Sequence, residues 1–205
     1  MSVVQVPGSM RYPWLGLLRH VGPIAIERVY GDDPEHLAAE ARAQNWLGSP
    51  GITESELVQH EQRLGVRLPP SYREFLQVTN GWDEDGIACG QLLPLAGIGW
   101  LRDLDPHLAD MWSSPADEKL LSVPDEDYFV YGEDQDTVHF RGEYVPDTLQ
   151  IGEYDAGTYL LNPHIKTSDG EWEAWYIAPW LPRAERCRSF WDLMNSRLRE
   201  YAEAP

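Results

Sequence analysis

Cysteine is scarce in this chain, and its two cysteines, Cys89 and Cys187, lie far apart in the sequence. That separation excludes a Cys-x-x-Cys redox or metal motif. Two reduced thiols, as expected of a cytoplasmic protein, are the favoured interpretation, and a disulfide is the alternative. Cys89 falls in a strand-like run and fits a small core residue. Cys187 stands between two arginines that would lower the pKa of its thiol, or else it is buried before the last helix.

Long hydrophobic runs are also absent. No apolar stretch approaches the roughly 20 residues that a membrane-spanning helix needs. The first ten residues, MSVVQVPGSM, lack the charged region and the apolar region of a secretory signal peptide. We therefore expect a soluble protein of the cytoplasm.

The usual spacings of catalytic and metal-binding side chains are missing as well. The six histidines are scattered without a His-x-x-x-His pair, and an acidic turn at 134–136 lacks the glycine and the glutamate of a calcium loop. Residues 97–99, Gly-Ile-Gly, lack the third glycine of a dinucleotide loop, and no nucleophile elbow or phosphate loop occurs. Carboxylates are so abundant that a glycosidase-like pair cannot be recognised. We predict a non-enzymatic protein without a cofactor or a metal site.

Negative charge is the strongest global property of the sequence. The formal net charge is −18, which would repel phosphate backbones and argues against direct nucleic-acid binding. Residues 81–160 contain 18 of the 34 acidic residues and only three basic ones. The acidic clusters flank predicted turns or strand edges, so we expect them to be exposed. The candidate partner-binding residues are Asp83, Glu84, Asp85, Asp125, Glu126, Asp127, Glu133, Asp134 and Asp136.

Two interpretations of these clusters remain open at this stage. In the first, the charge only keeps the surface solvated and the protein soluble. In the second, the clusters form a docking face for a basic protein, and electrostatic steering accelerates association. Binding of the second kind would weaken steeply with salt.

Residues 51–82 carry the densest local structural signals. Thr53 followed by Glu56 predicts a capping box at a helix start, and Gly65 is placed to end that helix. Pro70 suits the first turn of a second helix. Four residues then recur at i, i+3, i+4 and i+7 and form one face of this helix, namely Tyr72, Phe75, Leu76 and Thr79. Asn80 and Gly81 are predicted to close this helix, because both tolerate the left-handed conformation.

The same stretch resembles the SUKH superfamily, which includes yeast cell-wall-synthesis regulator homologues and many bacterial immunity proteins. The resemblance extends over about residues 52–201. The residues that carry it are Glu56, Glu61, Leu64, Gly65, Leu68, Pro69, Pro70, Ser71, Tyr72, Phe75, Leu76, Asn80 and Gly81, with Tyr159, Leu160, Leu161, Glu173, Ala174, Trp175, Ser189 and Phe190 further along. It implies an α+β fold with N-terminal helices, a central antiparallel sheet and a closing C-terminal helix. These residues are structural and identify no partner-contacting position.

The rest of the chain agrees with an α+β class. Aromatic and β-branched runs predict short strands at 128–131, 137–140, 149–154, 158–161 and 171–177, with turns at 132–136 and 155–157. Short turns between them favour an antiparallel meander. Ser189 is predicted to cap a final helix whose apolar stripe is Phe190, Met194, Leu198 and Tyr201.

The segments before and between these elements are harder to assign. We expect strands at 3–6 and 24–30, a helix at 34–46 and a break at 48–51. Residues 87–95 are strand-like, residues 98–104 fit either a strand end or a helical turn, and residues 105–106 suit a helix start. Residues 1–50 are interpreted as an N-terminal extension packed on a main domain at 51–205.

Aromatic residues are dense near the C-terminus, and two interpretations apply to them. Packing of the sheet on the final helix is favoured, and exposed tryptophans as binding anchors are the alternative. The residues concerned are Trp172, Trp175, Tyr176, Trp180 and Trp191.

The leading hypothesis for function is a non-enzymatic protein-binding module. The resemblance implies an immunity protein that occludes a cognate bacterial toxin, and the acidic surface fits a toxin with a basic surface, such as a nuclease. A regulatory adaptor, as in cell-wall-synthesis signalling, is the alternative that the yeast relatives suggest. A hydrolase built on surface carboxylates is a third hypothesis.

Overall fold

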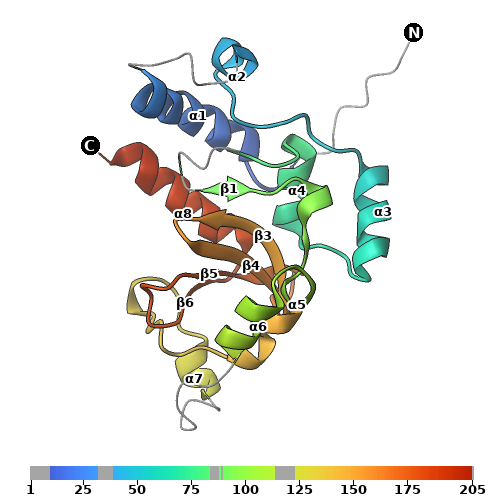
Figure 1. Cartoon of the computed structure of the whole chain (residues 1–205), viewed down its shortest axis with the longest axis vertical. Coiled ribbons are helices and arrows are strands. Elements are labelled where there is room, and N and C mark those ends of the chain that lie inside the picture. Colours follow the sequence, from blue (N-terminus) through green and yellow to red (C-terminus); the bar gives the residue numbers. More distant parts are fainter. Residues whose placement is uncertain (1–9, 32–38, 84–87, 89, 114–122, 205) are drawn as a thin grey trace.

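The computed structural model describes residues 10–31, 39–83, 88, 90–113 and 123–204. In this part of the chain, a six-stranded antiparallel sheet is covered by helices on both faces (Figure 1). The predicted α+β class, with a central antiparallel sheet and a closing C-terminal helix, is confirmed.

The centre of the sheet is a meander of four consecutive strands. They are β3 (Leu149–Tyr154), β4 (Gly157–Lys166), β5 (Trp172–Ile177) and β6 (Ala184–Cys187). Two short strands, β1 (Gln91–Leu92) and β2 (Gly99–Trp100), both pair with β3. The predicted turn between β3 and β4 is present: Asp155 and Ala156 have φ values of 45° and 59°, as a tight two-residue hairpin of right-handed twist requires.

Alternation along β4 and β5 divides the core into two clusters. Tyr159, Leu161 and Ala174 face the larger cluster. It also holds buried apolar residues of four helices, namely α1 (Trp14–Tyr30), α3 (Glu54–Leu64), α4 (Pro70–Val78) and α8 (Phe190–Glu203). Leu160 and Trp175 face the opposite way, into a smaller cluster with Leu101 of α5 (Leu101–Leu104) and Ala109 of α6 (Pro106–Ser113). Because side chains alternate across a strand, one run of apolar residues serves both layers.

The helix pair predicted at 51–82 is present as α3 (Glu54–Leu64) and α4 (Pro70–Val78). Thr53 and Glu56 form the complete capping box, and Gly65 adopts the left-handed C-cap with φ 74°. The predicted end of the second helix is wrong, because α4 is capped by Thr79 in an extended conformation. Asn80 instead accepts a hydrogen bond from the backbone N–H of Leu95 at 2.8 Å.

The N-terminal region contains α1 (Trp14–Tyr30) and α2 (Ala39–Gln44). The strand expected at 24–30 is wrong, since those residues form the second half of α1. The apolar residues before them, Trp14, Leu17, Leu18 and Val21, set a helical period that carries on through Ala25 and Ile26. The described part of the expected helix at 34–46 is α2, and the expected strand at 3–6 lies outside the described residues.

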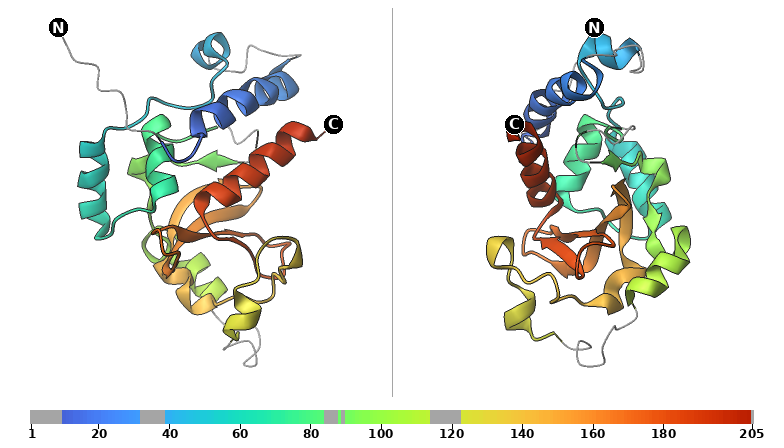
Figure 2. Two further views of the ribbon diagram at one scale, coloured as in Figure 1. Left: turned by 180° about the vertical axis from the view of Figure 1, so that it is seen from behind. Right: turned by 60° about the vertical axis from the view of Figure 1, so that its left-hand side comes forward.

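Helix α1 packs beside α8 (Phe190–Glu203), and Figure 2 shows the two lying side by side. The Trp14 ring contacts Phe75, Phe190 and Trp191, with centroid distances of 4.7–5.3 Å. At the other end, the Arg28 guanidinium donates to the last backbone carbonyls of α8, those of Tyr201, Ala202 and Ala204. The predicted Ser189 cap is confirmed, because its hydroxyl accepts the N–H of Asp192 at 3.0 Å. The predicted division of the chain at residue 50 stays a prediction.

The region before β3 departs most from expectation. The strands expected at 128–131 and 137–140 and the hairpin turn between them are wrong. Residues 123–148 instead form α7 (Asp125–Tyr128), η4 (Gly132–Asp134) and η5 (Gly142–Asp147). Tyr128 and Phe140 are both buried. Each is an isolated buried residue that attaches an irregular segment to the sheet, and the two do not belong to the alternating pattern of a strand.

The predictions for the shorter stretches between residues 87 and 106 agree with the structure in part. The described part of the strand-like run 87–95 contains only β1, followed by η2 (Leu95–Gly97). Residues 98–104 contain both predicted alternatives, β2 and then α5, and α6 begins at Pro106 as expected. Among the C-terminal aromatics, Trp172, Trp175 and Tyr176 are buried and Trp191 is half-buried, whereas Trp180 is exposed.

Candidate partner-binding surface

Six of the predicted acidic residues lie together on one segment, residues 125–136. We call this the acidic segment. Asp125, Glu126 and Asp127 belong to α7, Glu133 and Asp134 belong to η4, and Asp136 follows two residues later. All six are exposed. Figures 1 and 2 show this segment at one end of the molecule, away from α1 and α3. All six carboxylates are thus exposed on one stretch of 12 residues, and their role in binding stays a prediction.

The cluster around Asp83 behaves differently. Asp83 is buried, with 1% exposure, and its Oδ2 accepts the backbone N–H of Ala88 at 2.6 Å. Its own N–H donates to the carbonyl of Leu47 at 3.0 Å. The expectation that Asp83 is exposed is therefore wrong, because its side chain is buried and hydrogen-bonded within the fold. Glu84 and Asp85 lie outside the described residues.

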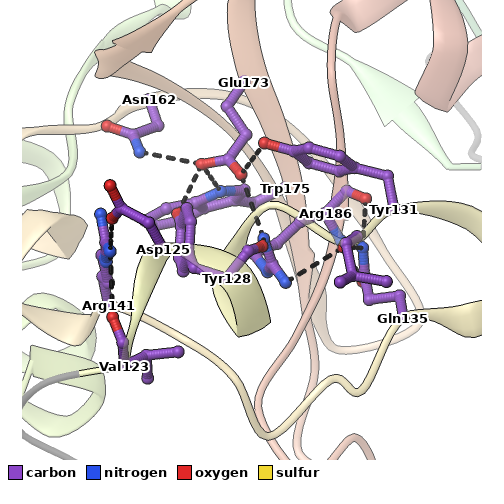
Figure 3. Close-up of polar contacts among 11 residues, drawn as sticks. Val123, Asp125, Tyr128, Tyr131, Gln135, Arg141, Asn162, Glu173, Trp175 and Arg186 are labelled. Carbon is purple, nitrogen blue, oxygen red and sulfur yellow. Dashed lines mark hydrogen bonds and ion pairs between the residues drawn. The ribbon is translucent and has the colours of Figure 1, made fainter.

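A buried carboxylate fixes the acidic segment to the sheet. Glu173 on β5 has 1% exposure and accepts hydrogen bonds from Tyr128 Oη at 2.6 Å and Tyr131 Oη at 2.9 Å (Figure 3). Two further donors come from the sheet itself, Asn162 Nδ2 at 3.1 Å and Trp175 Nε1 at 2.8 Å. The two tyrosines flank Phe129 and Val130, so the segment is bound to Glu173 on either side of that dipeptide.

Arg186 on β6 supplies the positive charge for this carboxylate. Its Nη1 lies 3.4 Å from Glu173 Oε1, and both side chains are at most 1% exposed. The guanidinium also donates to the backbone carbonyls of Tyr128 and Val130, and it stacks 4.2 Å from the centroid of the Tyr128 ring. Gln135 forms two hydrogen bonds with the Arg186 backbone, at 2.7 and 2.8 Å. The acidic segment is thereby held at 128, 130, 131 and 135.

The chemistry of this network is structural. Burial, and then the charge and hydrogen bond of Glu173, raise the pKa of both Tyr128 and Tyr131 well above the usual value near 10. Both phenols therefore remain protonated donors at neutral pH. Because Glu173 and Arg186 are closed to solvent, no substrate can reach them, and what they provide is a fixed position for the surface residues above.

The outer side of the segment carries unbalanced negative charge. Arg141 pairs with Asp125, donates to the carbonyl of Val123 at 2.9 Å and lies 4.2 Å from the Tyr128 ring centroid. Among the residues that the structure describes, no basic side chain forms an ion pair with the other five carboxylates. Phe129, 41% exposed, lies next to them. The surface thus combines an exposed aromatic ring with excess negative charge on a rigid support.

Reasoning from the sequence named Glu173 only as part of the family resemblance, and it missed the pairing of Glu173 with Arg186 and with the two tyrosines. A signal was present, because Glu173 and Arg186 are charged residues within the strand sequences WEAWYI and AERC. A charge in a strand buried on both faces needs a partner, and Glu and Arg on adjacent strands supply one.

Among the described residues, no group of three His, Cys, Asp or Glu side chains is arranged to hold a metal ion. Cys187 is half-buried and carries a free thiol, and burial raises its pKa to about 12, which is opposite to the lowering expected from its arginine neighbours. Cys89 lies outside the described residues. None of the helices in the described part of the chain is long and apolar enough to span a membrane.

Fold and surface together define an α+β domain that holds an acidic segment rigidly on one side of an antiparallel sheet. Residues 51–196 match the model of the SMI1 / KNR4 family (SUKH-1). The chain belongs to this family, which confirms the resemblance noted from the sequence. No curated protein matches the chain significantly. Membership fits a protein-interaction or immunity-type module.

Proposed function

We propose that this protein is a non-enzymatic immunity protein, which binds a cognate bacterial toxin through the acidic segment and blocks it by occlusion. The observation that carries this proposal is the acidic segment itself: exposed carboxylates beside Phe129, fixed from below by Glu173 and Arg186. A toxin domain with a basic surface, such as a nuclease, is the complementary partner, because its substrate phosphates and these carboxylates would compete for the same cations.

Rigid support matters for affinity. Ordering a flexible loop on binding costs free energy for each immobilised side chain, whereas a preorganised surface avoids that cost. Tyr128, Tyr131 and Gln135 are already bound to the sheet network, so the acidic segment meets its partner with little further ordering. An exposed aromatic ring is also typical of protein interfaces, in which aromatic side chains are enriched.

The direct test is co-expression with the product of a neighbouring toxin gene, followed by co-purification and a growth-rescue assay. Rescue and a stable complex are expected. The binding surface is then tested by reversing three of its charges in one variant, with a control variant that reverses three exposed charges elsewhere. The test substitutions are Glu126→Lys, Asp127→Lys and Asp134→Lys, and the control substitutions are Glu27→Lys, Asp103→Lys and Glu203→Lys.

The test variant is expected to lose rescue and to bind at least about tenfold more weakly at low salt, while the control variant binds as the parent does. Affinity of the parent should fall steeply between low and high ionic strength, because surface charges are screened within about 10 Å at 0.1 M salt. Equal binding by both variants, or a flat salt response, would contradict the acidic surface as the site. Capture of housekeeping proteins without any toxin partner would favour the regulatory adaptor instead.

A further inference from the structure

A second surface of opposite character lies beside the helix pair. A groove of about 540 Å³ runs between the α3–α4 corner and the hairpin that joins β4 to β5. That volume lies within the range of small-ligand and peptide sites. Its walls include Arg67 and Leu68 on the helix side, and Lys166 and Trp172 on the hairpin side. Figure 1 shows α3 and α4 far from α7, so this groove is separate from the acidic segment.

The carboxylates that line the groove are already engaged. Glu54 pairs with Arg73 and accepts from Gln77 Nε2 at 3.0 Å. Glu74 accepts the backbone N–H groups of Arg11 and Tyr12 at 3.0 and 2.8 Å. The third carboxylate, Asp169, pairs with the Arg11 guanidinium and accepts from the Thr167 hydroxyl. Each negative charge at the rim therefore has a partner within the fold.

Two cations of the groove lack such partners. Arg67 and Lys166 are exposed, and within the described part of the chain neither forms an ion pair with a carboxylate. The Lys166 ammonium lies 5.1 Å from the centroid of the Trp172 ring, a contact that holds it at the groove. The chain as a whole has a net charge of −18. This groove differs from the rest, because two unpaired cations from distant parts of the sequence line it.

The groove continues along α3 into a part with mixed polar and aliphatic walls. A second depression of about 440 Å³ shares Glu54, Arg67 and Arg73 with the first and also exposes Val58, which is 40% exposed, and Val66. A ligand that fills both parts is elongated and offers an anionic group next to an aliphatic one. An extended peptide has that shape and that alternation of side chains.

We propose that this groove binds an acidic peptide segment of a partner protein, with one glutamate or aspartate side chain held by Arg67 and Lys166. A carboxylate is favoured over a phosphate because the paired carboxylates at the rim and the net charge of the protein repel a dianion more strongly than a monoanion. The same repulsion disfavours a nucleic acid, whose charge repeats along its whole length. This site is independent of the acidic segment and of the function proposed for it.

The test is a titration of ¹⁵N-labelled protein with the blocked peptide acetyl-Leu-Ser-Glu-Ser-Leu-amide, followed by NMR. Leucines on both sides of the glutamate allow either chain direction. We expect shifts of the backbone amide signals of Leu68, Gly170 and Trp172 at about 1 mM peptide, a concentration that half-fills a site with a Kd of that size. The signal of Phe129, on the acidic segment, should not move.

Charge dependence is tested from both sides of the contact. The matched glutamine peptide, and the variants Arg67→Gln and Lys166→Gln with the glutamate peptide, should each bind about tenfold more weakly, because a charge-assisted hydrogen bond is lost. Arg199→Gln, an exposed arginine on α8 outside the groove, is the control variant and should bind as the parent does.

Four results would overturn the proposal. The first is equal binding of the glutamate and glutamine peptides, and the second is the absence of shifts at the groove. The other two use further peptides: one with phosphoserine in place of the glutamate, and the glutamine peptide with a free C-terminal carboxylate. Tighter binding of either one than of the glutamate peptide would also contradict the proposal. Because the toxin assay uses the acidic segment, failure of either test leaves the other intact.

Discussion

Two buried glutamates, Glu171 and Glu173, lie two residues apart at the start of β5, yet they are stabilised in different ways. Glu173 has a cationic partner, Arg186, in addition to four neutral donors. Glu171 is 2% exposed, and its hydrogen-bond donors among the described residues are all neutral: Tyr12 Oη at 2.8 Å, and the backbone N–H and hydroxyl of Ser71 at 2.9 and 2.6 Å.

The difference follows from what each glutamate touches. Ser71 lies in the first turn of α4, where the unpaired N–H groups and the helix dipole favour a negative charge, so Glu171 needs no cation. Glu173 meets no helix terminus, and the guanidinium of Arg186 takes that role. Each glutamate also anchors one surface of the molecule. Glu171 ties the N-terminal segment and α4 to the hairpin beside the groove, whereas Glu173 holds the acidic segment.

Removal of the cation should have the largest effect. We expect Arg186→Met to lower the free energy of unfolding by about 3–5 kcal/mol, because Glu173 is left as an unpaired buried charge. Urea unfolding measures this loss. The control Arg199→Met, at an exposed arginine, should change it by less than about 0.5 kcal/mol. In the double variant with Glu173→Gln, the loss should be smaller than the sum of the single losses, and additive losses would show that the pair is not coupled.

The helix-bound glutamate should be less sensitive. For Glu171→Gln we expect a loss of about 1–3 kcal/mol, because the amide nitrogen cannot accept from Ser71 or Tyr12 but no buried cation is left behind. The same urea experiment measures it, with Glu200→Gln on the surface of α8 as control. A loss as large as that of Arg186→Met would contradict the difference between the two sites.

Single hydroxyl deletions should separate the two anchored surfaces. Tyr12→Phe and Tyr131→Phe each remove one hydrogen bond to a buried carboxylate, and each should cost about 1 kcal/mol. Hydrogen exchange of backbone amides should distinguish them. Tyr131→Phe should speed exchange in residues 125–136 and leave α4 unchanged, whereas Tyr12→Phe should do the reverse. Equal changes in both regions would mean that the two networks are not independent.

The smallest effect is expected at Glu56, an exposed carboxylate that serves as a reference for the buried Glu171 and Glu173. Hydrogen bonds from the backbone N–H and the hydroxyl of Thr53 lower the pKa of Glu56 below its usual value. A lowered folded-state pKa means that this contribution to stability is present above the unfolded-state pKa and is lost as the pH falls through the folded-state pKa. NMR titration of the Glu56 carboxyl should show the lowering in the parent and a return toward 4.5 in Thr53→Ala. An unchanged pKa in that variant would contradict the capping box as its cause.

Local signals in the sequence were sufficient for the parts of the fold that have local causes. The capping box at Thr53 and Glu56, the Ser189 cap and the turn at Asp155 each depend on neighbours a few residues away, and all three are present. The strand prediction failed at 128–131 because Tyr128 and Tyr131 are placed by Glu173, some 40 residues later, and no local period records that contact.

The candidate surface could be predicted only in part for the same reason. The exposed positions of Asp125–Asp127 and of Glu133, Asp134 and Asp136 agree with the expectation from charge clustering. Asp83 looks equivalent in sequence but is buried, and it forms hydrogen bonds with the backbone of Ala88 and Leu47. The groove went unnoticed, since Arg67 and Lys166 are about a hundred residues apart and only the fold brings them together.

The contact between Arg28 and the end of α8 has a consequence for folding. Arg28 and the carbonyls that it binds are separated by 173 to 176 positions in the sequence. Nearly the whole chain must therefore be ordered before this contact can form. Contacts of such long sequence separation form late, because the loop-closure entropy has to be overcome first. During synthesis, the apolar face of α1 leaves the ribosome long before α8 exists to cover it. Until α8 is made, the apolar face of α1 is therefore exposed to aggregation.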